Sequence, residues 1–96
     1  MKLIYHPSVQ RDVTEVMDRY DDVSDTLADA FWRELEDALG LTASHPERCH
    51  FDASGLRRCN LDRFPYHFLF RIRKDHLWIV VVRHNRRHPS FGISRR

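Results

Sequence analysis

The sequence predicts an α+β domain in which an N-terminal strand and an α-helical hairpin pack on one face of a small antiparallel sheet. The predicted order along the chain is β-α-α-β-β-β. Two patterns of apolar residues and the length of the chain predict this fold. Apolar residues recur at helical spacing before Pro46, and they alternate with polar residues after it. The 96 residues suffice for one modest core, so we expect residues 1–96 to form a single domain.

The chain opens with a strand and a first helix. Residues 2–5 are mostly apolar and are followed by Pro7, which ends the strand. Ser8 is of a residue type that caps helices, and apolar residues at helical spacing follow it. We therefore expect one amphipathic helix over residues 9–20.

A second helix follows after a short polar break. Ser24 is placed as its cap, and a broad apolar stripe runs through residues 25–43. The helix is expected to end before Pro46, because the residue before a proline disfavours the helical conformation. The short link makes the two helices an antiparallel hairpin, and the stripe places Phe31 and Trp32 in the core.

Three strands are expected in the second half of the chain. They span residues 56–61, 66–73 and 77–83, with a turn at residues 74–76 between the last two. Strands joined by short turns pair antiparallel, so these three should form one sheet. The basic tail, residues 85–96, is expected to be a loop or short irregular structure.

Alternation along the middle strand gives the sheet two different faces. One face is apolar and is the natural partner of the helical hairpin; it carries Tyr66, Phe68, Phe70 and Ile72. The opposite face carries His67, Arg71 and Arg73, beside Arg58 and Asn60. We therefore expect a basic, histidine-containing sheet face that is open to solvent.

Charge divides the chain into an acidic and a basic part. Residues 1–44 hold four cations and ten acids, whereas residues 45–96 hold twelve cations and four acids. Fourteen of the sixteen cations are arginine, whose planar fork binds phosphate and carboxylate groups. This polarity indicates a polyanionic partner, and the alternative is a solvated basic surface. The residues expected to bind a target or polyanion are Arg71, Arg73, Arg83, His84, Arg86, His88, Arg95 and Arg96.

Composition excludes several classes of protein. No apolar run reaches the roughly 18–20 residues of a membrane span, and no secretory signal is visible, so we expect a cytoplasmic protein without a membrane partner. Cys49 and Cys59 are too few for a disulfide scaffold and lack the spacing of zinc ligands. No phosphate-binding glycine loop or serine-hydrolase motif is present. We therefore expect no metal, no cofactor and no small-molecule substrate.

Two stretches of the second half carry a resemblance to a known family. GLRRCNLDRFPYHFLFRI, residues 55–72, is followed after a short turn by WIVVVRHNRRHP, residues 78–89. Together with the helical hairpin that ends before Pro46, they resemble the RelE/ParE superfamily of toxins from bacterial type II toxin–antitoxin systems. The resemblance extends from Leu3 to Pro89 and implies a RelE/ParE-like fold.

The resemblance implies a toxin that arrests growth and is neutralised by a cognate antitoxin protein. The C-terminal segment of the antitoxin would be disordered alone and would fold as it wraps around the toxin. Trp32 or Trp78 would be partly exposed in the free toxin and covered by that segment. The superfamily has two kinds of target on one fold: RelE-like members cut mRNA in the ribosome, and ParE-like members poison DNA gyrase.

A RelE-like member would use catalytic residues, because RNA cleavage needs a base, an acid and cations around the phosphate. The candidates are Arg58, His67 and Arg87. His67 would be the base, since imidazole titrates near neutral pH, and the arginines would stabilise the phosphate. The sequence departs from the RelE-like pattern at Asn60, where a lysine is usual. It departs again after Arg87, where Phe91 is the only aromatic residue and a tyrosine is usual. In a RelE-like member, His67, His84 or His88 would then have to supply the missing acid–base group.

A ParE-like member would need a binding surface and no catalytic set. The strand start Phe64-Pro65-Tyr66 and the run from His84 to Pro89 look more ParE-like, so this interpretation is favoured. The surface would then be the basic tail, with Arg83, Arg86, Arg87, Arg95 and Arg96. A ribosome-dependent mRNA endonuclease is the alternative, and a non-toxic binding partner in an antitoxin complex is the second alternative.

Overall fold

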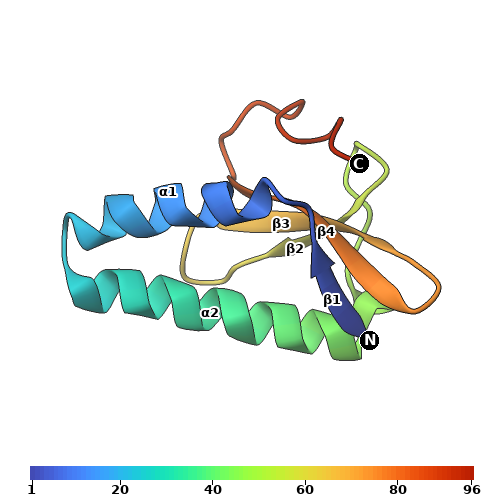
Figure 1. Cartoon of the computed structure of the whole chain (residues 1–96), viewed down its shortest axis with the longest axis horizontal. Coiled ribbons are helices and arrows are strands. Elements are labelled where there is room, and N and C mark those ends of the chain that lie inside the picture. Colours follow the sequence, from blue (N-terminus) through green and yellow to red (C-terminus); the bar gives the residue numbers. More distant parts are fainter.

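The computed structural model describes residues 1–96 and has two helices packed on one face of a four-stranded sheet (Figure 1). The order of the elements along the chain is the predicted one. They are β1 (Lys2–Tyr5), α1 (Val9–Asp21), α2 (Asp25–Ser44), a 3-10 turn (Pro46–Arg48), β2 (Arg57–Asn60), β3 (Tyr66–Ile72) and β4 (His76–His84). Neither helix offers an apolar stretch of the length that a membrane crossing needs.

The two helices begin in different ways. Oγ of Ser24 accepts a hydrogen bond from the backbone N–H of Leu27 at 3.0 Å, so the predicted cap of α2 is confirmed. Ser8 occupies the cap position of α1, but its hydroxyl makes no capping hydrogen bond. Its backbone N–H donates instead to Nδ1 of His6 at 3.0 Å. As predicted, α2 ends before Pro46.

The sheet has the strand order β1-β4-β3-β2. β3 pairs antiparallel with both β2 and β4, as predicted. The expectation of a wholly antiparallel sheet is wrong for β1, which runs parallel to β4. A parallel pair needs a long connection, and here the helical hairpin, β2 and β3 lie between the two strands in the chain. The sheet is therefore mixed, and β1 is one of its two edges.

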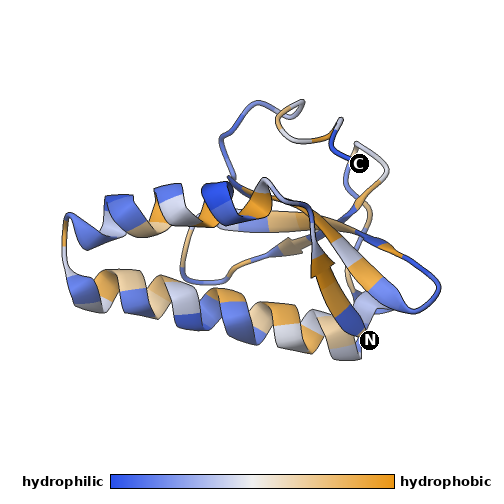
Figure 2. Cartoon of the chain, viewed as in Figure 1, coloured by the Kyte–Doolittle hydropathy of each residue, from blue (hydrophilic) through white to orange (hydrophobic).

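The main core lies between the helices and the sheet. The predicted apolar face of β3 is confirmed, because Tyr66, Phe68 and Phe70 are buried there and Ile72 packs beside them. Phe31 of α2 is completely buried and meets Tyr66 edge-on, with 5.4 Å between the ring centroids. Figure 2 shows apolar residues along most of the strands, whereas each helix alternates between apolar and hydrophilic residues.

The tail covers the part of the opposite sheet face that carries His67, so the expectation of an open, histidine-containing face is wrong for that part. Phe91 from the tail packs against a second buried cluster on this face, formed by Leu56, Leu69, Val80 and Val81. Alternation along a strand shows which residues share a face, but it does not show whether another segment covers them. Here the covering segment is the tail after β4, with Phe91 as its apolar anchor.

A bulge in β4 supplies part of the second cluster. Leu69 pairs with Val81, but the next residue of β3, Phe70, pairs with Ile79. Val80 is therefore an extra residue in β4. The bulge allows two consecutive valines to join the same cluster, and both are completely buried.

Hydrogen bonds and a close glycine contact hold the tail against the sheet. Nη1 of Arg83 donates to the carbonyl oxygens of Pro89 and Phe91 at 2.8 and 2.9 Å. Gly92 has a φ of +80°, and a Cβ atom at this position would lie 2.6 Å from Cγ2 of Val81. The tail has no helix or strand, as expected, but it is a folded layer on the sheet.

Candidate functional site

A hydrogen-bonded cluster lies under the tail and contains one of the catalytic candidates, His67. His67 and Arg83 are only 1% and 5% exposed. Nε of Arg83 donates to Nε2 of His67 at 2.9 Å. Because a guanidinium only donates, Nε2 carries no proton, and Nδ1 then donates to Oδ1 of Asn85 at 2.8 Å. Both ring nitrogens of His67 are thus occupied by other groups of the protein.

The same burial determines the charge of this histidine. Desolvation lowers the pKa of His67 to about 4, and the positive charges of Arg58 and Arg83 act in the same direction. The imidazole is therefore neutral at neutral pH. A general base needs a ring nitrogen within reach of the substrate proton, and this cluster leaves neither nitrogen free.

Arg58 lies on the same sheet face as His67 and is half-buried. Its Nε donates to Oδ1 of Asn60 at 2.8 Å, and its Nη1 lies 3.5 Å from Oδ1 of Asp52. The backbone N–H of Ser54 is the main cause that lowers the pKa of Asp52, and Arg58 adds to it. The guanidinium of Arg58 is thus engaged by two neighbouring side chains.

Arg87, the third catalytic candidate, lies in the tail and is exposed. Its guanidinium carbon stands 3.9 Å from the centroid of the Phe91 ring, a cation–π contact. The structure therefore brings Arg58 and His67 onto one sheet face, whereas Arg87 stacks on the tail that covers this face.

Two of the eight residues predicted to bind a polyanion are internal. Arg83 is buried in the cluster with His67. The side chain of Arg95 is 16% exposed and forms an ion pair with Asp12 of α1, with 2.6 Å between Nη1 and Oδ2. For Arg83 and Arg95 the expectation of an exposed basic surface is therefore wrong.

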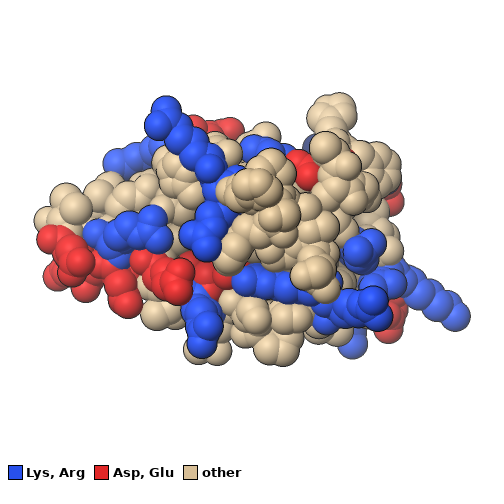
Figure 3. Space-filling view, turned by 90° about the horizontal axis from the view of Figure 1, so that it is seen from above, with Lys and Arg blue, Asp and Glu red and all other residues tan.

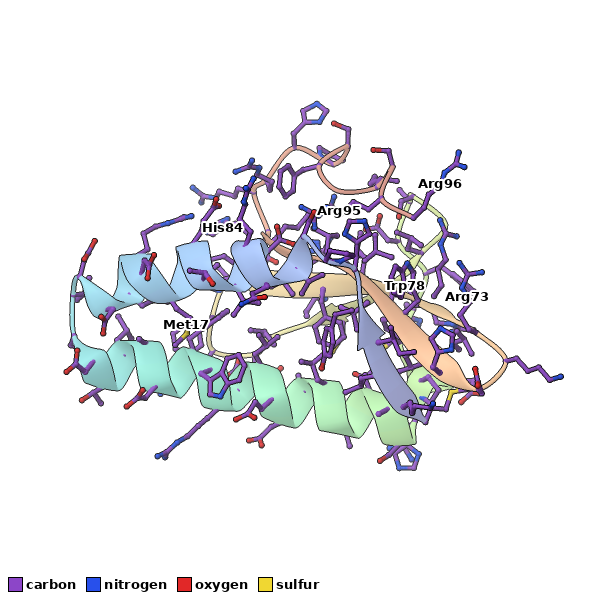
Figure 4. All side chains as sticks on the ribbon, in the orientation of Figure 1. Met17, Arg73, Trp78, His84, Arg95 and Arg96 are labelled. Atoms are coloured by element: carbon purple, nitrogen blue, oxygen red, sulfur yellow. The ribbon has the colours of Figure 1, made fainter.

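The other six polyanion candidates lie at two places. One group is at the start of the tail and contains His84, Arg86 and His88, next to Arg87. The other contains Arg71, at the end of β3, and Arg73, which follows the strand beside the turn into β4. Figure 4 shows Arg96 toward the same end of the molecule as Arg73. The candidates thus form two separate surfaces.

An apolar groove of about 650 Å³ lies between α1, α2 and β1. Its lining includes Val13 and Met17 of α1, Trp32 of α2 and Tyr5 of β1, and Figure 4 shows Met17 between the two helices. Trp32 is 43% exposed, so its placement in the core is wrong. The expectation of a partly exposed tryptophan is confirmed for this residue. A groove of this size and lining is typical of a binding site.

β1 borders the groove and has a neighbouring strand on one side only. Its side chains Ile4 and Tyr5 are 38% and 44% exposed. An edge strand offers unpaired backbone N–H and C=O groups to another chain. The edge and the groove together are suited to an extended or amphipathic segment of a partner protein.

Surface charge is also divided between the ends of the molecule. Figure 3 shows acidic side chains gathered at the end where α1 meets α2, and several cations at the opposite end, near the β3–β4 turn. The acidic end carries Asp18, Asp21, Asp22 and Asp25. The acids of the helical hairpin thus gather at one end of the molecule, whereas the cations also extend over its middle.

Asp12 is an important residue that the sequence analysis missed. It lies in the first turn of α1 and is buried, as are Val9 and Val16 on the same helix. An acid at a core position of an amphipathic helix signals a buried partner of opposite charge. That partner is Arg95, which lies in the segment expected to be an exposed loop.

Comparison with known proteins identifies one matching family. Its sequence model, described as "ParE toxin of type II toxin-antitoxin system, parDE", matches residues 3–89. The matched stretch covers nearly all of the chain, from within β1 to a point beyond β4. No curated protein matches the chain.

Proposed function

Because the chain belongs to the ParE family of toxins from type II toxin–antitoxin systems, we propose that it arrests growth by binding DNA gyrase through an exposed surface, without cleaving RNA. The family also implies a cognate antitoxin as its partner. In this proposal the antitoxin neutralises the toxin by occupying the groove between α1, α2 and β1.

The state of His67 is the observation that carries the proposal. In the RelE-like alternative His67 is the candidate base, and a base must reach the proton that it abstracts. His67 is 1% exposed, is neutral at neutral pH, and has both nitrogens bound by Arg83 and Asn85. A toxin that acts by binding needs none of these groups to be free, so the closed cluster favours a binding mode of action.

The segment from His84 to His88 is the target surface that we favour. Arg86, Arg87 and His88 are exposed, and none of them belongs to an ion pair in the structure. The backbone N–H of Arg86 donates to Nδ1 of His84 at 3.0 Å, which shapes the start of the segment. A cationic surface of this kind attracts an acidic region of a protein target and steers its approach.

The groove supports the proposed mode of neutralisation. Trp32 and Met17 offer large apolar side chains at its surface, and β1 offers an unpaired edge next to them. An amphipathic helix would bury the exposed indole, and an extended segment would add a strand to β1. Both binding modes use the groove or the edge of β1, and neither involves the closed cluster around His67.

The purified toxin should be tested first on DNA gyrase. We expect loss of plasmid supercoiling and accumulation of gyrase-cleaved DNA, both reversed by the cognate antitoxin. A parallel primer-extension assay on a defined mRNA uses a cell-free translation reaction with and without ribosomes. New ribosome-dependent 5′ ends would overturn the proposal. Inactivity in both assays, with normal growth on expression, would also overturn it and would indicate a non-toxic binding partner.

Matched variants separate the two modes of action. Arg86→Gln combined with Arg87→Gln should weaken gyrase inhibition at least severalfold, because two exposed cations of the target surface are lost. Arg11→Gln combined with Arg33→Gln removes the same charge from the exposed faces of the helices and should retain inhibition. Arg58→Lys and His67→Gln, once shown to be folded by circular dichroism, should stay active. Loss of toxicity in folded Arg58→Lys would point to a nuclease.

A further inference from the structure

A second exposed surface lies on the sheet face away from the helices, beside the turn between β3 and β4. Its position follows from strand register. Ile4 of β1 pairs with Trp78 of β4, and Trp78 pairs with Arg71 of β3. Directly paired residues project from the same face of a sheet, so these three side chains form one row across three strands.

The next row toward the turn adds two more cations. Lys2 pairs with His76, two residues before Ile4 and Trp78 in their strands. Arg73 follows Arg71 at the same interval, and its backbone N–H donates to the carbonyl oxygen of His76 at 2.8 Å. The period of two places Lys2, His76 and Arg73 on the face that carries the first row.

The cations of this surface have no acidic partner. Lys2, Arg71 and Arg73 are exposed and take part in none of the three ion pairs of the structure. The neighbouring acid, Asp75, is bound to Nδ1 of His76 at 2.8 Å. Three unpaired cations around one tryptophan favour an anionic ligand.

The side chain of Trp78 is half-buried, and its neighbours fix its orientation. It packs against the second buried cluster, and the ring of His6 meets it edge-on with 5.9 Å between the centroids. An indole held in this way is a preorganised platform, because its orientation does not have to be fixed on binding.

We infer that this surface, named here the hairpin face and consisting of Lys2, Ile4, Arg71, Arg73 and Trp78, binds a single strand of nucleic acid. A base stacks on the indole of Trp78, and backbone phosphates bind the surrounding cations. A single strand fits better than a duplex, because only an unpaired base offers its ring for stacking. Figure 4 shows Arg96 toward the same end of the molecule as Trp78 and Arg73.

The inference goes beyond the gyrase proposal and uses a different surface from the segment His84–His88. Nucleic-acid binding is measured on the toxin alone, so failure of one proposal does not affect the test of the other. The decisive experiment titrates the full chain, carrying Trp32→Phe, with a fluorescein-labelled oligothymidylate at several salt concentrations. Trp78 is then the only tryptophan, since the chain has two.

We expect quenching of Trp78 fluorescence in parallel with the rise in fluorescein anisotropy, and affinity that falls as salt increases. Arg71→Gln combined with Arg73→Gln should weaken binding about tenfold. It should also reduce the slope of log K against log salt by about 1.4, since each single-strand phosphate contact contributes about 0.7. The Arg11→Gln and Arg33→Gln pair removes the same charge elsewhere and should change the affinity by less than about twofold.

Trp78→Leu tests the stacking contribution separately and should weaken binding at least about fivefold. Because Trp78 contacts the buried cluster, a loss of binding in this variant is assigned to stacking only if its unfolding curve stays close to that of the unmodified chain. Equal losses in the Arg71/Arg73 and Arg11/Arg33 pairs would overturn the inference, because binding would then be general charge attraction. Equal affinity for an oligothymidylate and a polyaspartate peptide, or no quenching of Trp78, would overturn it as well.

Discussion

The carboxylate of Asp12 in α1 holds the guanidinium of Arg95 from the tail through two hydrogen bonds. Nη1 donates to Oδ2 at 2.6 Å, and Nη2 donates to Oδ1 at 2.9 Å. Oδ2 also accepts the backbone N–H of Val82 at 3.1 Å, and Nη1 also donates to the carbonyl oxygen of Val80 at 3.2 Å. One ion pair thus joins α1, β4 and the tail.

Removing one partner of this pair should destabilise the protein strongly. Asp12→Ala leaves the guanidinium of Arg95 largely buried without its counter-charge, which costs about 3–5 kcal/mol in comparable pairs. The free energy of unfolding from urea denaturation measures this loss. The double variant Asp12→Ala and Arg95→Met should lose less than the sum of the single changes. Additive losses would show that the two side chains do not depend on each other.

Gly92→Ala should loosen the tail. The new methyl group would lie 2.6 Å from Cγ2 of Val81, and the φ of +80° is unfavourable for alanine. We expect a loss of roughly 1–3 kcal/mol in unfolding free energy, with faster hydrogen exchange in residues 85–96. Gly40→Ala is the matched control, since nothing lies within 4 Å of its added Cβ in α2. It should stabilise the protein by about 1 kcal/mol.

Because of His67, the free energy of unfolding should decrease as the pH falls from about 6.5 to about 4. Its pKa is about 4 in the folded chain and 6.5 as a free side chain, so between these values the unfolded chain binds the extra proton. The contribution of His67 is fully present above pH 6.5 and decreases by at most about 1.4 kcal/mol per pH unit below it. Urea denaturation across this range measures the slope. His67→Gln should have a smaller slope, and an unchanged slope would contradict the assignment.

Trp32→Ala should weaken antitoxin binding with little effect on folding. The side chain is 43% exposed at the groove, so its removal leaves only a small gap in the free toxin. Large aromatic anchors commonly contribute 2 kcal/mol or more to an interface, which is about 30-fold or more in Kd. Isothermal titration with the cognate antitoxin measures the change. A Kd within about twofold of the original would place the antitoxin elsewhere.

Patterns within single elements predicted much of the fold. The apolar stripes predict both helices to within one residue at each end. Alternation from Tyr66 predicts which face of β3 lies in the core. The cap at Ser24 was also predictable, because a capping serine acts on the backbone three residues later. Such signals lie close together in the chain.

The features that were missed depend on contacts between distant segments. The parallel pairing of β1 and the pairing of Asp12 with Arg95 join the two ends of the chain. His67 was placed on the correct face, but its burial depends on a tail that the sequence marks only as basic and irregular. Phe91 was the available signal, since a lone large aromatic residue in such a tail suggests an apolar anchor.

The parallel pairing of β1 with β4 also sets an order of events while the chain is being made. Residues 2–5 leave the ribosome before the other elements of this domain, and their partners, residues 76–79, emerge only after both helices, β2 and β3. Until then the helical hairpin has no complete sheet to cover, and long-range pairing of this kind is slow to form. The groove is complete only when β1 and Val82 of β4 are both in place. A partner that recognises the groove therefore binds the finished domain and not the emerging chain.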